Sequence, residues 1–298
     1  MTRSSLQTAL VTGASSGIGK ETARALAQKG LTVGLVSRGS GSGEQVTETL
    51  KRETGNPNLY YFPADLSSLT EIRRVAEEIR SRFNRLDILV NNAGAFFRTR
   101  ETTVDGFEKT FALDHLNYFL LTQLLLPPLL ESPAARIVNV ASAASSVGKI
   151  HFDDLMLEDY RSFKAYGQAK LANVMFSYQL SRFLADTPVT VNALHPGGVA
   201  TNFGSGSTTG TLYKVFQPFF KTPAQGAETV VYLATSPEVV GVSGRYFKDK
   251  NPVSSSRRSY DVQVQARLWR VSRDLVGLTE DEGAALRQVT PHHRKGFL

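Results

Sequence analysis

Short apolar runs alternate along the chain with longer segments whose apolar residues recur at helical spacing. The short runs predict strands at residues 7–11, 31–36, 59–62, 86–90, 137–140, 189–194 and 245–247. The longer segments predict helices at residues 18–29, 44–52, 69–84, 104–126, 163–185 and 224–234. Because the strand runs are continuously apolar, they indicate a parallel sheet buried on both faces. We therefore predict an α/β fold: a doubly wound, Rossmann-type parallel sheet of about seven strands, flanked by helices on both faces.

Glycine and proline mark several of the predicted boundaries. Gly30 is well placed to end the first helix. A Gly/Ser-rich loop is expected at residues 38–43, before the second helix. The long helix at 104–126 is expected to end at Pro127-Pro128, because a proline inside a helix removes a backbone hydrogen bond.

Composition narrows the classes of function. The chain has no cysteine, which excludes disulfides, thiolate metal sites and a cysteine nucleophile. The N-terminus does not resemble a signal peptide. The longest apolar stretch, residues 119–130, is interrupted by Thr122, Gln123 and two prolines, and is too short to span a bilayer. We therefore expect a soluble, cytoplasmic protein.

The formal net charge is +7, from 34 basic and 27 acidic residues. The basic residues are scattered and show no stripe interleaved with aromatic residues, so we do not expect nucleic-acid binding. A solvated surface with a local pocket for an anionic cofactor explains the charge better. Weak attraction to an anionic membrane surface stays open.

A glycine-rich turn follows the first predicted strand. In LVTGASSGIGKETARALA (residues 10–27), Gly13, Gly17 and Gly19 stand between a strand and a helix. Glycines let the backbone approach a pyrophosphate, and the helix N-terminus offers free N–H groups and partial positive charge. The turn predicts a dinucleotide site, although a plain tight turn would show the same glycines.

In KAYGQAKLANVMF (residues 164–176), Tyr166 and Lys170 lie one helical turn apart, about 5.4 Å along the axis. A tyrosine ordinarily titrates near 10, and a lysine cation beside it stabilises the tyrosinate. That arrangement suits a general acid or base that works near neutral pH. The alternative is a solvated pair on a helix surface.

Several further motifs occur in a fixed order. TGASSGIG spans residues 12–19, Asp65-Leu66 ends the third strand, and NNAG follows the fourth at 91–94. NVAS follows at 139–142, YxxxK at 166–170, and HPGGVAT at 195–201. Together they resemble the short-chain dehydrogenase/reductase superfamily over residues 6–247.

The resemblance implies a catalytic set and a cofactor site. The catalytic residues would be Ser142, Tyr166 and Lys170, with Asp114 at a fourth position where the family usually has an asparagine. The implied cofactor-binding residues are Gly13, Ser15, Ser16, Gly17, Ile18, Gly19, Arg38, Asp65, Leu66, Asn92, Ala93, Gly94, Tyr166, Lys170, Pro196, Gly197, Val199 and Thr201.

Asp114 is a departure from the family pattern. The family asparagine helps hold a proton-relay water through its backbone, a role that an aspartate could also serve. A carboxylate near Lys170 could instead strengthen the proton affinity of the lysine and weaken its effect on Tyr166. Asn117, one turn later, is better explained as an ordinary helix residue.

The second predicted strand ends in Ser37 and Arg38, with no acidic residue there. A carboxylate at this point favours NAD, whereas an arginine accommodates the 2′-phosphate of NADP. We therefore expect NADP(H) as the cofactor, and no metal. The alternative is that Arg38 is simply a surface residue before a flexible loop.

The chain is expected to form a single NADP-binding catalytic domain over residues 1–250. It would include substrate loops at 143–163 and 202–222, with a C-terminal helical appendage and tail at 251–298. We expect one helix near 260–276, followed by a charged tail whose paired histidines are not a metal site.

The two loops and the aromatic pair Phe96-Phe97 are rich in apolar residues. These residues either line a lipophilic substrate pocket or pack in the core or a dimer contact. The retinol-dehydrogenase branch is resembled by three segments: the loop at 143–163, GRYF and ARLWRVSRDLVGL. Many members of that branch carry an N-terminal membrane anchor that is not seen here. The resemblance implies NADPH-dependent interconversion of a lipophilic, retinal-like aldehyde or ketone and its alcohol.

Three other functions fit the sequence less well. A catalytically silent NADP-binding sensor would keep the fold, although Ser142, Tyr166 and Lys170 are all present. A sugar epimerase or dehydratase would need different glycine spacing and a larger C-terminal domain. Several light-driven reductases use a cysteine, which is absent. The resemblance also implies a homodimer formed through the helices at 104–126 and 163–185.

Overall fold

The computed structural model describes residues 7–198 and 221–290. Its centre is an eight-stranded sheet in the order β3-β2-β1-β4-β5-β6-β7-β8. All pairings are parallel except that of β7 with β8. The strands are β1 Thr8–Thr12, β2 Thr32–Ser37, β3 Leu59–Pro63, β4 Ile88–Asn91, β5 Arg136–Val140, β6 Thr190–Leu194, β7 Tyr246–Lys248 and β8 Asn251–Val253.

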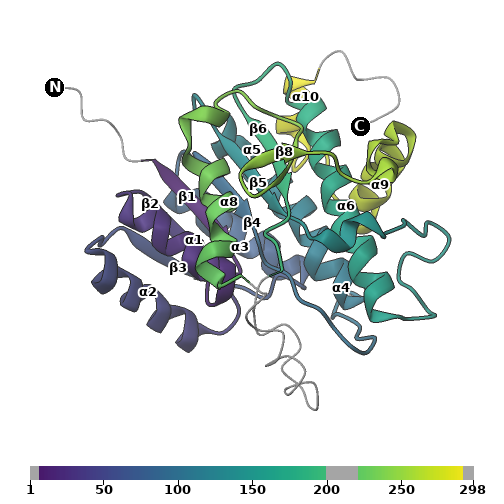
Figure 1. Ribbon diagram of the computed structural model, residues 1–298, viewed down its shortest axis with the longest axis horizontal. Coiled ribbons are helices and arrows are strands. Elements are labelled where there is room, and N and C mark those ends of the chain that lie inside the picture. Colours follow the sequence, from purple (N-terminus) through teal and green to yellow (C-terminus); the bar gives the residue numbers. More distant parts are fainter. Residues whose placement is uncertain (1–6, 199–220, 291–298) are drawn as a thin grey trace.

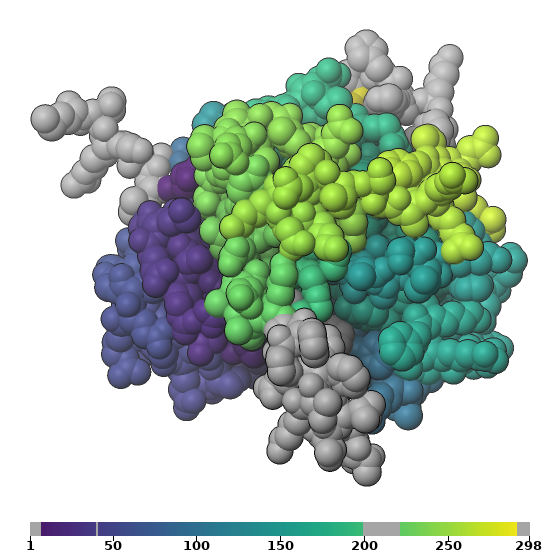
Figure 2. All heavy atoms as spheres, viewed as in Figure 1, coloured from purple at the N-terminus to yellow at the C-terminus, as the bar shows by residue number. Residues whose placement is uncertain are grey.

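Helices cover both faces of this sheet (Figure 1). The larger ones are α1 Gly17–Gln28, α2 Ser40–Thr54, α3 Leu69–Arg82, α5 Asn117–Leu130, α6 Ser162–Phe183, α8 Pro223–Thr235 and α9 Val262–Leu275. Helices α1 and α8 pack together over one apolar core, and α3, α5, α6 and α9 enclose the other. Figure 2 shows α8 in green beside α1 in purple. The predicted doubly wound α/β fold is confirmed, with one strand more than expected.

The segment predicted as a loop at residues 38–43 is mostly helical, because α2 already begins at Ser40. Gly39 makes the turn with a φ of 76°. Gly43 is a packing residue, since a Cβ there would lie 2.1 Å from the ring of Tyr61. Glycine in this stretch therefore serves a tight turn and a close contact rather than an extended loop.

The helix predicted at residues 104–126 starts and ends at other residues in the structure. It starts with the short helix α4, Lys109–Phe111, after Glu108 caps the N–H groups of Thr110 and Phe111. At the other end Pro127 and Pro128 lie inside α5, which runs to Leu130. The prolines fall in the last turn, where burial of the surrounding leucines outweighs the lost hydrogen bonds.

The C-terminal segment packs against the rest of the fold. The boundary predicted at residue 250 lies in the turn between β7 and β8, where Asp249 and Lys250 both have positive φ, as in tight hairpins. Trp269 of α9 is 4% exposed and packs against the rings of Phe119 and Phe176. A short helix, α10 (Ala284–Val289), was not predicted.

Helix α5 is buried along almost its whole length: apart from Pro127 and Leu130, each of its residues is buried within this one chain. It packs against α3, α9 and α10. Across the described ranges, no helix combines the length and the apolar character needed to cross a membrane.

Candidate active site

The turn after β1 forms a tight backbone cradle. Gly13 and Gly17 have φ values of 66° and 56°, which favour glycine. A Cβ on Gly13 would lie 2.9 Å from the Cα of Ala93. A Cβ on Gly19 would lie 2.3 Å from the carbonyl oxygen of Gly13 and 2.5 Å from Nδ2 of Asn92. The open backbone before the N-terminus of α1 fits the pyrophosphate of a dinucleotide.

Thr12, for which the sequence suggested no separate role, ties this cradle to the next strand. Its hydroxyl oxygen accepts the N–H groups of Asn92 and Ala93, both at 2.9 Å. Nδ2 of Asn92 donates in return to the carbonyl oxygen of Thr12 at 2.8 Å. The signal in the sequence for this contact was that Thr12, a hydroxyl residue, ends one predicted strand, while Asn92 follows another.

A cavity of about 550 Å³ opens at the carboxyl ends of the strands. Predicted cofactor residues that line it are Gly13, Ser15, Ser16, Gly17, Ile18, Arg38, Leu66, Asn92, Ala93, Gly94, Tyr166, Lys170 and Pro196. It is also lined by residues that were not predicted: Ser37, Ala64, Ala95, Leu113, Val140 and Ala141.

Three predicted cofactor residues in the described part of the chain, Gly19, Asp65 and Gly197, do not line the cavity. Gly19 lies beneath the turn. Oδ1 of Asp65 accepts the N–H and hydroxyl of Ser67, and the N–H of Gly197 donates to Nδ1 of His195. Val199 and Thr201 lie outside the described residues, as does most of the loop predicted at 202–222.

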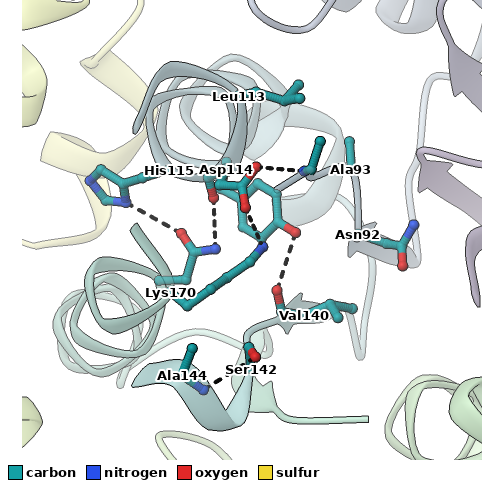
Figure 3. Close-up of polar contacts among 12 residues, drawn as sticks. Asn92, Ala93, Leu113, Asp114, His115, Val140, Ser142, Ala144 and Lys170 are labelled. Atoms are coloured by element: carbon teal, nitrogen blue, oxygen red, sulfur yellow. Dashed lines mark hydrogen bonds and ion pairs between the residues drawn. The ribbon is translucent and has the colours of Figure 1, made fainter. Parts of the chain in front are cut away.

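Asp114 and Lys170 form a buried ion pair. Oδ2 of Asp114 lies 3.0 Å from Nζ of Lys170, and their side chains are 0% and 4% exposed. Oδ1 of Asp114 accepts the N–H of Ala95 at 2.8 Å. Figure 3 shows the two side chains pointing toward each other from neighbouring helices. Asp114 lies in a π-helical turn, Ala112–Leu116, of a kind often found at functional sites.

Gly94 makes room for this pair. A Cβ on Gly94 would lie 2.9 Å from Nζ of Lys170 and 3.1 Å from Oδ1 of Asp114. The glycine of the NNAG turn thus lies directly against the charged groups. Asn117, in contrast, donates its side-chain N–H to the carbonyl oxygen of Leu113 and stabilises the helix locally.

The ion pair changes the electrostatics around Tyr166. Burial raises the pKa of Tyr166, the charge of Lys170 lowers it, and the charge of Asp114 raises it. Burial lowers the pKa of Lys170, but the charges of Asp114, Tyr118 and Tyr166 outweigh burial and raise it overall. Burial also raises the pKa of Asp114, against the opposing effect of Lys170. Tyr166 therefore faces a nearly neutral pair rather than an isolated cation.

Ser142 and Tyr166 are brought together by a close helix contact. The 3₁₀ turn that follows Ser142 packs on the start of α6, where a Cβ on Gly148 would lie 2.2 Å from the carbonyl oxygen of Gly167. A hydrogen bond from Ser142 lowers the pKa of the Tyr166 hydroxyl. Nζ of Lys170 lies 5.5 Å from the centre of the Tyr166 ring. Tyr166 and Lys170 thus line the cavity, and Ser142, which does not line it, is hydrogen-bonded to Tyr166.

The apolar residues of the predicted substrate segments divide into two groups. Ile150, Leu155 and Leu157 are buried, the first two in the main core. Phe96 instead lines the cavity and packs against Tyr166, with ring centres 5.6 Å apart, and against Phe163, which is 76% exposed. In the described residues, the aromatic surface beside Tyr166 comes from Phe96 and Phe163.

The fold and this site define a family. The family model for short chain dehydrogenases matches residues 7–210, so the chain belongs to that family and is an oxidoreductase of the short-chain dehydrogenase/reductase type. It is 41% identical to mouse retinol dehydrogenase 12 over 271 residues, which cover 90% of this chain and 86% of that protein.

Solved structures agree with this assignment. A crystal structure of a protein from Mycobacterium paratuberculosis superposes with a TM-score of 0.75 at 32% identity, over 91% of this chain and 93% of that chain. An actinorhodin polyketide ketoreductase crystallised with NADPH superposes with a TM-score of 0.65 at 28% identity, over 83% of this chain and 97% of that chain.

Proposed function

We propose that the protein is an NADP(H)-dependent oxidoreductase that interconverts a lipophilic, retinal-like aldehyde or ketone and its alcohol. The observation that carries this proposal is that Tyr166, hydrogen-bonded to Ser142, and Lys170 line the same cavity as the glycine cradle. Phe96 and Phe163 extend an apolar surface from the Tyr166 ring. The similarity to a retinol dehydrogenase supports the lipophilic class of substrate.

Each residue of the site has its own role in the proposed reaction. The cofactor, when bound, supplies the hydride in reduction and takes it in oxidation. Ser142 holds the substrate oxygen by a hydrogen bond, and Tyr166 delivers a proton to that oxygen during reduction. In oxidation the tyrosinate form of Tyr166 removes the same proton and becomes neutral. Lys170 stabilises the tyrosinate, and Asp114 holds the ammonium group in place while reducing its effect.

Substrate turnover tests this proposal directly. NADPH consumption is measured with all-trans-retinal and a series of aliphatic aldehydes of increasing length. We expect turnover, with kcat/KM rising with chain length because the surface beside Tyr166 is apolar. Tight NADPH binding without turnover of any of these carbonyls would instead favour a silent NADP-binding sensor.

Replacing Arg38 is expected to change the cofactor preference. Arg38 is exposed and lines the cavity at the end of β2, where it can bind a 2′-phosphate. We expect Arg38→Ala to weaken NADPH binding about tenfold and to leave NADH binding nearly unchanged. Arg52→Ala, an exposed arginine of α2 away from the cavity, serves as the control. An equal effect on both cofactors would contradict the role of Arg38.

Replacing Asp114 is expected to alter the pH dependence of alcohol oxidation. Oxidation requires the tyrosinate, so its rate rises with pH through the pKa of Tyr166. The charge of Asp114 raises that pKa, and Asp114→Asn removes the charge while retaining an acceptor for Ala95. The rising limb should move to lower pH, with several-fold faster oxidation at pH 7. A pH–rate profile with an unchanged limb would show that Asp114 does not act on Tyr166.

A further inference from the structure

A line of hydrogen bonds joins the C-terminal helix α9 to the buried ion pair. Nε2 of His115 lies 2.9 Å from the hydroxyl of Ser272 in α9, and its Nδ1 lies 3.3 Å from Oδ1 of Asn173 in α6. Nδ2 of Asn173 donates to the main-chain oxygen of Asp114 at 2.7 Å. Figure 3 shows the hydrogen bond that His115 makes on the side of Asp114 and Lys170.

The chemistry of the groups fixes the direction of each hydrogen bond. The carbonyl oxygen of Asp114 only accepts, so the Asn173 amide must face it with Nδ2 and present Oδ1 to His115. His115 must then carry its proton on Nδ1. Its Nε2 is left as an acceptor, and Ser272 donates to it.

His115 is held in the neutral form. The residue is fully buried, with the rings of Phe111 and Phe176 beside it. Burial lowers its pKa to about 4. A neutral imidazole has one donor and one acceptor, so Nδ1–H donates to Asn173 and Nε2 accepts from the hydroxyl of Ser272.

We propose that Ser272 and His115 are positioning residues for the reaction, and that α9 thereby forms part of the catalytic apparatus. Ser272 holds the His115 ring by donating to Nε2, the Nδ1–H of His115 holds the Asn173 amide, and Asn173 anchors the π-helical turn that carries Asp114. This inference rests on the proposed function for its catalytic consequence, but the hydrogen-bond arrangement can be tested without turnover.

Loss of the Ser272 hydroxyl leaves the buried Nε2 of His115 without a donor, which is costly for a buried acceptor. The tautomer stays the same, because Asn173 still requires a proton on Nδ1. The His115 ring is then held only through Nδ1, so the Asn173 amide and the turn that it anchors are held less firmly. The Asp114–Lys170 pair next to Tyr166 loses part of its support.

Nitrogen-15 NMR of the histidine rings tests the arrangement directly. The chain has five histidines, and His115→Asn identifies the signals of His115 by their disappearance. In the wild type we expect a neutral ring at pH 7 with the proton on Nδ1, and in Ser272→Ala the same tautomer with a changed Nε2 chemical shift, because Nε2 loses its donor. A wild-type ring protonated on Nε2, or an Nε2 signal unchanged by Ser272→Ala, would overturn the proposal.

Kinetics test the catalytic consequence. We expect Ser272→Ala to lower kcat about tenfold with the KM for NADPH unchanged, and Ser272→Thr to restore part of the kcat. The matched control is Ser259→Ala, a serine that is 0% exposed, hydrogen-bonded and outside this line, compared with 1% for Ser272. Similar losses of thermal stability in both alanine variants, with kcat lowered only in Ser272→Ala, would support positioning.

Two other outcomes of the kinetic experiment would each reject a proposal. Equal losses of kcat in both alanine variants would reduce Ser272 to a structural role and overturn the proposal. No turnover by the wild type with any carbonyl would reject the proposed function, while the NMR experiment would still decide whether Ser272 donates to Nε2 of His115.

Discussion

Tyr166→Phe is expected to lower kcat for carbonyl reduction by about three orders of magnitude while NADPH binding stays within about twofold. The substitution removes only the hydroxyl. The ring contacts with Phe96 and Lys170 can persist, so the pocket keeps its shape. What disappears is the proton donor to the substrate oxygen, and the hydrogen bond with Ser142.

A second tyrosine provides an unusually close control. The Tyr118 ring also lies 5.5 Å from Nζ of Lys170, but its hydroxyl is buried and donates to the carbonyl oxygen of Val140. Tyr118→Phe should therefore cost some stability and less than tenfold in kcat. If both variants lost activity alike, proton transfer could not be assigned to Tyr166. The measurement is single-turnover reduction together with NADPH titration.

Lys170→Met is expected to lower the free energy of unfolding by about 3–5 kcal/mol, because it leaves the carboxylate of Asp114 buried without its partner. For a chain of this size the melting temperature should fall by roughly 10 °C. Thermal unfolding of the purified variant measures this. Unchanged stability would mean that the ion pair is not formed.

The loss of stability in Lys170→Met is expected to depend on pH. Burial already raises the pKa of Asp114 above its ordinary value, and removal of Lys170 removes an opposing effect. A group whose folded pKa is raised favours the folded state at low pH and loses that contribution as pH rises. Lys170→Met should therefore be least destabilised under acidic conditions. The double variant Lys170→Met with Asp114→Asn should recover much of the stability at neutral pH.

The sequence was sufficient for the fold and for much of the site because parallel strands bring their carboxyl ends to one edge of the sheet. Motifs at Gly13, Asn92 and Ser142 each follow a strand, so their convergence could be predicted from strand order alone. Tyr166 and Lys170 reach the same edge from α6. The catalytic and cofactor roles of these residues stay predictions.

Other features depend on contacts between distant residues. Apolar character alone could not separate Ile150, which packs in the core, from Phe96, which lines the cavity. Ser272 is 157 residues from His115, and no local pattern indicated their contact. Likewise Asp249 and Lys250 are not the glycine or asparagine that usually signals a hairpin with positive φ.

The burial of α5 has a consequence for assembly. The dimer implied by the family resemblance would use the faces of α5 and α6, but α9 lies against both of them, with Trp269 between aromatic rings from each helix. A second copy could reach the part of that surface that α9 covers only by displacing α9. The protein thus supplies from its own chain the apolar cover that a partner would otherwise provide there.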